Sequence, residues 1–143
     1  MEEKFEYIEK TKKQLRNWFN SKKREKIKFE NFDNFYSWYK EQDKVCYYCG
    51  LSEKDSQKIV KTGLLKSNRF PENGIISSGR ARGMWLEIDR KDPNKKYSED
   101  NCVLACYFCN NDKSDVFDAK QYKKYLKDRS KFFKDILNND TNS

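Results

Sequence analysis

Four of the five cysteines form two Cys-x-x-Cys pairs, Cys46 with Cys49 and Cys106 with Cys109. Each such turn directs two thiolates toward one point, and two turns complete the tetrahedron that zinc prefers. The spacing therefore predicts a structural Cys₄ zinc site that joins two distant parts of the chain. A redox-active cysteine pair is the alternative. A Cys₄ zinc is coordinatively closed, so any hydrolytic chemistry needs a second metal ion.

A group of oxygen-bearing side chains surrounds the second cysteine pair. Residues 86–113 read as strand, loop, strand and helix, with the first apolar run ending in Asp89 and Arg90. Asn101 precedes the second apolar run, and Asn110 directly follows the last cysteine of the pair. Carboxylate and amide oxygens suit Mg²⁺. We expect these side chains to converge where the two strands meet the helix.

This stretch resembles the HNH, or ββα-metal, nuclease motif, and the resemblance covers residues 31–120. It implies that Asp89 and Asn110 hold a catalytic Mg²⁺ or Mn²⁺, and that Asn101 orients the neighbouring catalytic group or holds the hairpin loop. Arg90 stands where the family has its catalytic histidine, and the chain contains no histidine. The Asp-Arg pair resembles a restriction-enzyme variant of the family in which the same pair precedes Cys-x-x-Cys-Asn.

The absence of histidine leaves the proton acceptor to be found elsewhere. A guanidinium has a pKa above about 12 and is not an ordinary general base at neutral pH. The resemblance implicates a tyrosine near the arginine, and we expect Tyr48, with its pKa lowered by the nearby cation Arg90. Tyr47 and Tyr39 are rivals. Glu87, on the same strand face as the aspartate, is the carboxylate alternative.

The charge balance favours a polyanionic partner. The chain has 31 Lys and Arg against 23 Asp and Glu, for a net charge of +8. With the motif, this predicts DNA binding through phosphate contacts. A solvated basic surface is the alternative for each contact. The expected DNA-binding residues are Arg80, Arg82, Lys113, Lys22, Lys23 and Arg24.

The composition is thin for a core, since hydrophobic residues make up 36%, but aromatic residues reach 15%. Aromatic side chains bury a large area each, and a structural metal supplements a small core. The N-terminus lacks the apolar stretch of a signal peptide, and no apolar run reaches membrane-spanning length. We therefore expect a cytoplasmic protein of a bacterial or phage-infected cell, with reduced cysteines.

The length of 143 residues predicts one domain over residues 1–143. Helical periodicity marks most of the segments outside the ββα motif. The expected parts are a basic helical extension over 1–30, the zinc knuckles and ββα-metal core over 31–117, and a C-terminal helix over 118–138. Expected helices span 3–20, 53–65, and a stretch capped by Asn31 or Asp33 that ends near 42; residues 66–83 should form a loop.

These features predict a small α+β protein with a zinc-stabilised ββα-metal core surrounded by helices. The resemblance implies a metal-dependent endonuclease acting on duplex DNA, of restriction type or phage-encoded. A restriction-type enzyme often works as a homodimer on a palindrome, so DNA and a second copy are the expected partners. A catalytically inactive HNH-like DNA-binding zinc module and an RNA-targeting nuclease are the alternatives.

Overall fold

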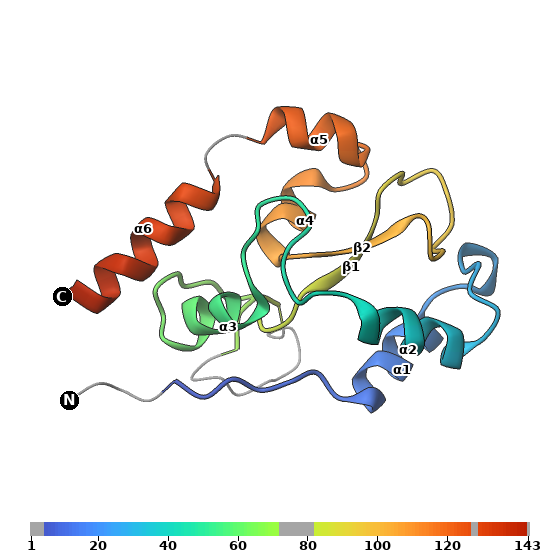
Figure 1. Cartoon of the computed structure of the whole chain (residues 1–143), viewed down its shortest axis with the longest axis horizontal. Helices are drawn as coiled ribbons and strands as arrows, with labels where there is room; N and C mark the ends of the chain where they lie inside the picture. Colours follow the sequence, from blue (N-terminus) through green and yellow to red (C-terminus); the bar gives the residue numbers. More distant parts are fainter. Residues whose placement is uncertain (1–4, 72–81, 127–128, 143) are drawn as a thin grey trace.

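A two-stranded antiparallel sheet lies at the centre of the computed structural model, which describes residues 5–71, 82–126 and 129–142 (Figure 1). Strand β1 (Glu87–Arg90) pairs with β2 (Cys102–Ala105). Helix α4 (Tyr107–Lys113) follows two residues after β2 and packs against β1. The predicted order of strand, loop, strand and helix is confirmed.

Short helices surround this ββα unit, as expected for the α+β class. Helices α1 and α2 lie together at one end of the molecule, and α6 lies at the other (Figure 1). Their bounds are α1 Lys12–Ser21, a 3-10 turn Arg24–Lys26, α2 Phe32–Glu41, α3 Glu53–Lys61, α5 Ala119–Tyr125 and α6 Arg129–Asn142.

Two helix starts follow from their capping residues. Asn31 precedes α2, and its side chain accepts a hydrogen bond from the Asn34 amide at 2.9 Å. Asp118 precedes α5 and accepts from the Gln121 amide at 2.8 Å. Each side chain satisfies a backbone donor that the first helical turn leaves free. Both starts agree with the sequence.

The first helix is shorter than predicted. Thr11 and Gln14 form a reciprocal capping box, so α1 begins at Lys12 and not at residue 3. Residues 5–11 are extended and run past α3 toward α1 (Figure 1). The apolar residues of this segment are spaced as in a helix, although the segment is extended. Side chains of other elements bind its backbone, as Gln57 binds the amide and carbonyl of Ile8, and these bonds replace those of a helix.

Two other predicted helices differ from the apolar pattern: one ends earlier, and the C-terminal one is interrupted but continues to Asn142. Helix α3 stops at Lys61 because the chain turns at Gly63, which has a φ of +73°. The expected C-terminal helix is divided into α5 and α6, with Leu126 in an extended conformation. The change of direction brings Phe133 onto Phe108 of α4, at a ring-centroid distance of 4.9 Å.

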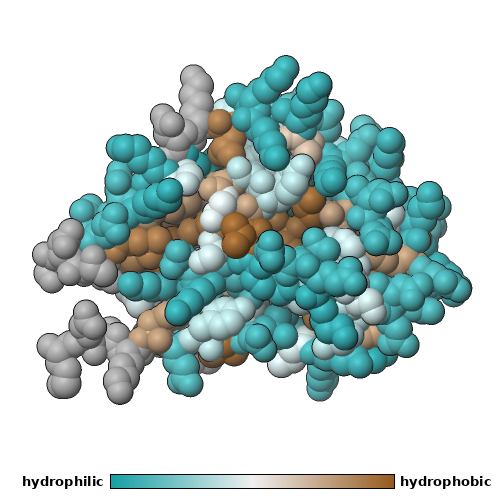
Figure 2. Space-filling model, viewed as in Figure 1, coloured by the Kyte–Doolittle hydropathy of each residue, from teal (hydrophilic) through white to brown (hydrophobic). Residues whose placement is uncertain are grey.

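The core is rich in aromatic side chains. Phe35 is fully buried, and its ring centroid lies 5.0 Å from that of Trp18 and 5.3 Å from that of Phe29. These contacts bind α1 to α2 and to the segment between them. Figure 2 shows hydrophilic side chains over most of one face, with a band of hydrophobic residues between them. Among the described residues, no helix is both long and apolar enough to cross a membrane.

Glu53 connects three segments from inside the protein. Its side chain is 1% exposed. One carboxylate oxygen accepts a hydrogen bond from the Leu86 amide at 2.9 Å, and the other accepts from the Tyr7 hydroxyl. The first turn of α3 is thereby attached to the residue before β1 and to the extended N-terminal segment.

We predict that Glu53→Ala destabilises the protein by about 1–3 kcal/mol, because it leaves the buried Leu86 amide without an acceptor. Urea unfolding followed by tryptophan fluorescence measures the change. Lys54→Ala, at the exposed neighbouring position on α3, is the control and should stay within about 0.5 kcal/mol of the parent. Equal stabilities of the Glu53→Ala variant and the control would contradict this role.

Candidate active site

The four paired cysteines meet at one buried point. Their sulfur atoms all lie within 4.8 Å of one another, and the sulfurs of Cys49 and Cys106 are 3.7 Å apart. Tetrahedral zinc with bonds of about 2.3 Å places its sulfur ligands about 3.8 Å apart. The cluster can therefore hold a metal ion, and its donor set is that of a structural zinc site.

Local backbone geometry shapes both cysteine turns. In the first, Gly50 has a φ of +82°, and its amide donates to the carbonyl of Cys46 at 3.0 Å. In the second, Cys106 is the N-cap of α4, and its sulfur accepts from the amide of Cys109 at 3.4 Å. The fifth cysteine, Cys102, lies in β2, where burial raises its pKa to about 12.

The meeting of the cysteine turns brings Tyr48 to β1. The Tyr47 amide donates to the Leu104 carbonyl of β2 at 2.8 Å, which fixes the first turn against the sheet. The Tyr48 hydroxyl then donates to Oδ2 of Asp89 at 2.6 Å. Two residues that are 41 positions apart in the sequence thus share a short buried hydrogen bond.

A cavity of about 450 Å³ opens beside Asp89, at the junction of β1, α4 and α1. It gathers three of the expected site residues from β1, together with Asn110 from the second turn of the ββα helix. It also receives cationic side chains from the N-terminal part of the chain. Its polar and charged lining includes Lys10, Lys22, Arg82, Glu87, Asp89, Arg90, Tyr97 and Asn110.

Asp89 is a buried carboxylate with a buried cation beside it. The Lys113 ammonium is fully buried and lies 3.3 Å from Oδ2 of Asp89; it also donates to the Arg90 carbonyl at 2.9 Å. Burial raises the pKa of Asp89, whereas the hydrogen bond from Tyr48 and the charge of Lys113 oppose the rise. The expectation that Lys113 contacts a DNA phosphate is corrected, because this side chain faces inward.

Glu87 and Asn110 form a second polar group in the cavity. The Arg82 guanidinium donates two hydrogen bonds to the Glu87 carboxylate, of 2.6 and 2.7 Å. Its Cζ atom lies 4.6 Å from the centroid of the Tyr107 ring. The Asn110 amide nitrogen donates to the same carboxylate at 2.8 Å. Glu87 therefore fixes the Asn110 side chain so that its amide oxygen remains as a ligand atom.

Arg90 lies against a tyrosine other than the expected one. Its guanidinium stacks on the Tyr97 ring at 4.8 Å, and Nη1 donates to the Lys95 carbonyl at 3.2 Å. Burial, with the Asp89 hydrogen bond and charge, raises the pKa of Tyr48. The predicted lowering of that pKa by Arg90 is thus corrected: the anion at Asp89 is the closer charge.

Asn101 closes the loop between the two strands. Its side-chain oxygen accepts from the Asp92 amide at 3.0 Å, and its nitrogen donates to the carbonyls of Asp92 and Lys96. These bonds make it the residue that holds the hairpin loop, one of the two roles considered from the sequence. Because Arg90 ends β1 at the start of this loop, Asn101 also limits where the arginine can lie.

The two rival tyrosines lie in different surroundings from Tyr48. Tyr39 is buried in the aromatic core, with its ring centroid 6.5 Å from that of Phe35. Tyr47 is 42% exposed, and the Lys123 ammonium lies 3.9 Å from its ring centroid. The cavity lining includes none of these three tyrosines, and what distinguishes Tyr48 from its rivals is its hydrogen bond to Asp89.

The basic residues expected to bind DNA have different positions. Lys22 lines the cavity, with its ammonium 5.4 Å from the ring centroids of both Trp18 and Tyr97. Lys23 and Arg24 follow on the exposed surface. Arg80 lies outside the described residues.

Sequence reasoning did not place Lys10 and Tyr97 in the site, although both line the cavity; Lys10 was weighed only as a basic residue of a helix that could contact the DNA backbone. Lys10 fell within a predicted helix, although the Thr-x-x-Gln pattern that begins at Thr11 is a capping signal. Tyr97 lay in a polar loop without periodicity. Its position depends on a bridge to the segment after α1, where its amide donates to the Lys26 carbonyl at 2.8 Å.

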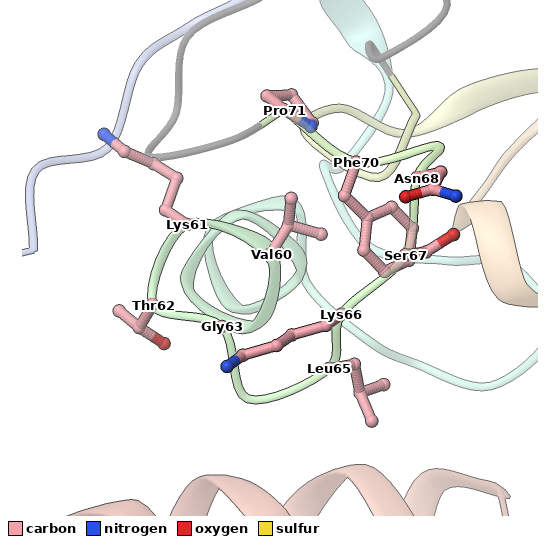
Figure 3. A pocket seen from close by; sticks show the side chains of 10 residues that line it. All are labelled: Val60, Lys61, Thr62, Gly63, Leu65, Lys66, Ser67, Asn68, Phe70 and Pro71. Atoms are coloured by element: carbon pink, nitrogen blue, oxygen red, sulfur yellow. The ribbon is translucent and has the colours of Figure 1, made fainter.

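A larger hollow, of about 740 Å³, lies at the end of α3 (Figure 3). Its lining includes Lys61, Lys66, Ser67 and Asn68, around the ring of Phe70. The described residues that line it include no carboxylate and no cysteine, so they offer no comparable metal-binding donor set. The residues for which the sequence predicts metal binding, Asp89 and Asn110, line the smaller cavity instead.

One solved structure relates this arrangement to a known protein. The match is to PacI, described as a rare-cutting HNH restriction endonuclease with an extraordinary mechanism of DNA perturbation. The TM-score is 0.57 with 26% sequence identity, and the match covers 83% of this chain and 73% of PacI. No protein-family model and no curated protein matches the chain. The chain thus has an α+β fold similar to that of PacI and resembles the HNH nucleases, as its sequence predicted.

Proposed function

We propose that this protein is a metal-dependent endonuclease that hydrolyses phosphodiester bonds in duplex DNA, of restriction type or phage-encoded. One observation carries the proposal: a cavity beside the ββα unit joins the oxygen ligands Asp89 and Asn110 to several cations. The nuclease-like fold supports the same reading. A phosphate group meets metal ligands and positive charge together in such a place.

Asp89 and Asn110 would hold a divalent cation, Mg²⁺ or Mn²⁺. Their donor set fits such an ion, because the amide nitrogen of Asn110 is occupied by Glu87 and its oxygen is left as a ligand. Asp89 keeps acceptor capacity on Oδ1, because Tyr48 binds Oδ2 and the hydrogen bond from Lys113 to Oδ1 is long, at 3.5 Å. A cation bound there supplies Lewis-acid stabilisation of the phosphate oxygens.

Arg90 is positively charged at any pH near neutral, whereas a histidine at this position would be charged only when protonated. Its planar fork suits two phosphate oxygens, and stacking on Tyr97 limits its rotation. Among the described residues Arg90 has no carboxylate partner. We assign it to the scissile phosphate, while Asn101 holds the loop that follows it.

Tyr48 takes the proton-handling position in this proposal. Its hydroxyl donates to Asp89 at 2.6 Å and its pKa is raised, so it would accept the proton of an attacking water only after a divalent cation held by Asp89 had lowered that pKa and taken up the charge of the carboxylate. Glu87, the carboxylate alternative, already has three hydrogen bonds from Arg82 and Asn110. It therefore serves better to orient Asn110 than to accept a proton.

The DNA backbone would follow the basic surface that leads out of the cavity. Lys22 lies in the cavity and Lys23 and Arg24 continue from it, so all three are assigned to phosphate contacts. A second copy of the chain on a palindromic site stays a prediction. We assign zinc to the Cys₄ cluster.

The experiment that tests the proposed function uses genomic DNA of high complexity, because a rare recognition sequence can be absent from a small plasmid. The protein is incubated with this DNA, and separately with RNA, in Mg²⁺, Mn²⁺ or EDTA, and the new ends are sequenced. Cleavage of DNA alone, with metal, supports the proposal. Cleavage of RNA alone favours an RNA nuclease. DNA binding without cleavage under any metal favours an inactive binding module.

We predict that Cys106→Ser loses both the metal and the folded state, because the free energy of zinc binding in such sites stabilises the folded protein. Elemental analysis and thermal unfolding measure the two effects. Cys102→Ala, which removes the buried cysteine outside the cluster, should keep one zinc per chain. A folded parent protein without zinc would refute the assignment.

We predict that Asp89→Ala and Asn110→Ala abolish cleavage while DNA affinity stays close to that of the parent. The lost atoms hold the cation and not the duplex. Cleavage assays and fluorescence anisotropy with labelled duplex measure the two properties. Asp100→Asn, an exposed carboxylate in the turn before β2, is the control. If either site variant cuts at the parent rate, its residue is not a ligand.

We predict that Tyr48→Phe slows cleavage on the order of 10²–10⁴-fold, the range for loss of a general base. DNA affinity should not change, and Tyr47→Phe should retain the parent rate because Tyr47 is 42% exposed and its ring faces Lys123. The rates are compared at several Mg²⁺ concentrations. Recovery of the Tyr48→Phe rate at high Mg²⁺ would mean that the hydroxyl only positions Asp89.

A further inference from the structure

The extended N-terminal segment, residues 5–11, is fastened to the protein at two points on either side of Lys10. The carbonyl of Ile8 accepts from the Gln57 side chain at 2.6 Å and from the Trp85 indole at 2.9 Å. The Ile8 amide donates back to Gln57 at 3.0 Å. Beyond Lys10, the capping box of Thr11 fixes the start of α1.

The first of these fastenings uses a buried polar group. Gln57 is completely buried, and both ends of its amide bind the backbone of Ile8, whose own side chain is 45% exposed. A buried amide is costly unless it is hydrogen-bonded, so this glutamine stabilises the protein only while the segment lies in place. The path of the segment is therefore specified by buried polar groups of the core, Gln57 at Ile8 and Glu53 at the Tyr7 hydroxyl.

The consequence of this path is the position of Lys10. The side chain is half-buried and lines the cavity beside Asp89 and Asn110. Within residues 5–71, 82–126 and 129–142, its ammonium has no hydrogen-bond or ion-pair partner. Burial lowers the pKa of Lys10, whereas the charges of Glu53 and Glu87 oppose the fall. A cation partly removed from water in this way gains most from an anion that enters the cavity.

We propose that Lys10 is a catalytic residue that contacts the scissile phosphate, and that residues 5–11 form a strap whose attachment to Gln57 places it there. The inference rests on the proposed function. Lys10 approaches the phosphate from the side of α1, and Arg90 approaches it from the end of β1. Charge growing on the phosphate oxygens during hydrolysis is stabilised by a cation already held in place.

The test compares Lys10→Gln with the parent on the duplex that the parent cleaves. We expect kcat to fall on the order of 10²-fold, as for loss of one preorganised group at a developing oxyanion. KM, zinc content and thermal stability should be close to parental, and Lys10→Arg should recover part of the rate. Lys13→Gln, an exposed lysine on α1 outside the cavity, is the matched control.

A strap variant tests the second half of the proposal. Gln57→Met keeps the volume of the side chain and the Lys10 ammonium, but removes the two bonds between Gln57 and Ile8 and leaves the one from Trp85. We expect it to lower kcat in the same direction as Lys10→Gln. A Gln57→Met protein that is folded and cuts at the parental kcat would overturn the strap.

Protection of Lys10 from acetylation gives a readout that does not need turnover. The protein is treated with an acetylating reagent in Ca²⁺, with and without random-sequence duplex, and each lysine is quantified by mass spectrometry. DNA should protect Lys10 but not Lys54, which is exposed on α3.

The outcomes separate the two proposals. Parental cleavage with an unaffected kcat for Lys10→Gln, or a change in KM alone, overturns the role of Lys10 and leaves the nuclease intact. No cleavage by the parent with any metal overturns the proposed function. The Lys10 contact is then decided by acetylation, and a Lys10 that DNA does not protect overturns it.

Discussion

The meeting of two cysteine turns is the constraint on which the rest of the structure depends. Cys46 and Cys49 lie before α3, and Cys106 and Cys109 open α4, yet their sulfurs converge at one buried point. This convergence holds the first turn against β2 and so delivers Tyr48 to Asp89. A small protein with a thin hydrophobic core gains a fixed centre in this way. The site and the fold thus share one anchoring point.

The buried partners of Asp89 fix the position of its carboxylate. A buried carboxylate is costly unless paired and hydrogen-bonded, and Lys113 and Tyr48 satisfy both needs. Lys113 is itself completely buried, so its ammonium pairs with Asp89 inside the protein and is not accessible to a bound anion. The cations left to meet an anion are those at the rim of the cavity, including Arg90 and Lys22.

In the function that we propose, arginine stands where the HNH nucleases have histidine, and two chemical roles would be divided between two side chains. An imidazole can both accept a proton and carry charge, whereas a guanidinium can only carry charge. The structure holds Arg90 by stacking on Tyr97, which suits a fixed electrostatic role. In the proposed mechanism proton transfer falls to a second group, and the cysteine turn holds the phenol of Tyr48 against Asp89. Under that proposal, two segments far apart in sequence would perform the two roles.

The sequence by itself determined the local features: the cysteine pairs, the order of strand, loop, strand and helix, and the cap at Asp118, while it left Asn31 and Asp33 as alternatives for the cap of α2. Each depends on residue types at short spacing, which a linear pattern records. Only the tertiary structure decided that Lys113 faces inward, that Arg90 lies on Tyr97 and that residues 5–11 are extended. Lys113 and Ile8 have partners distant in sequence, Asp89 and Gln57, and the position of Tyr97 depends on its bridge to Ile27. Burial and long-range hydrogen bonds set these positions, and no local periodicity encodes them.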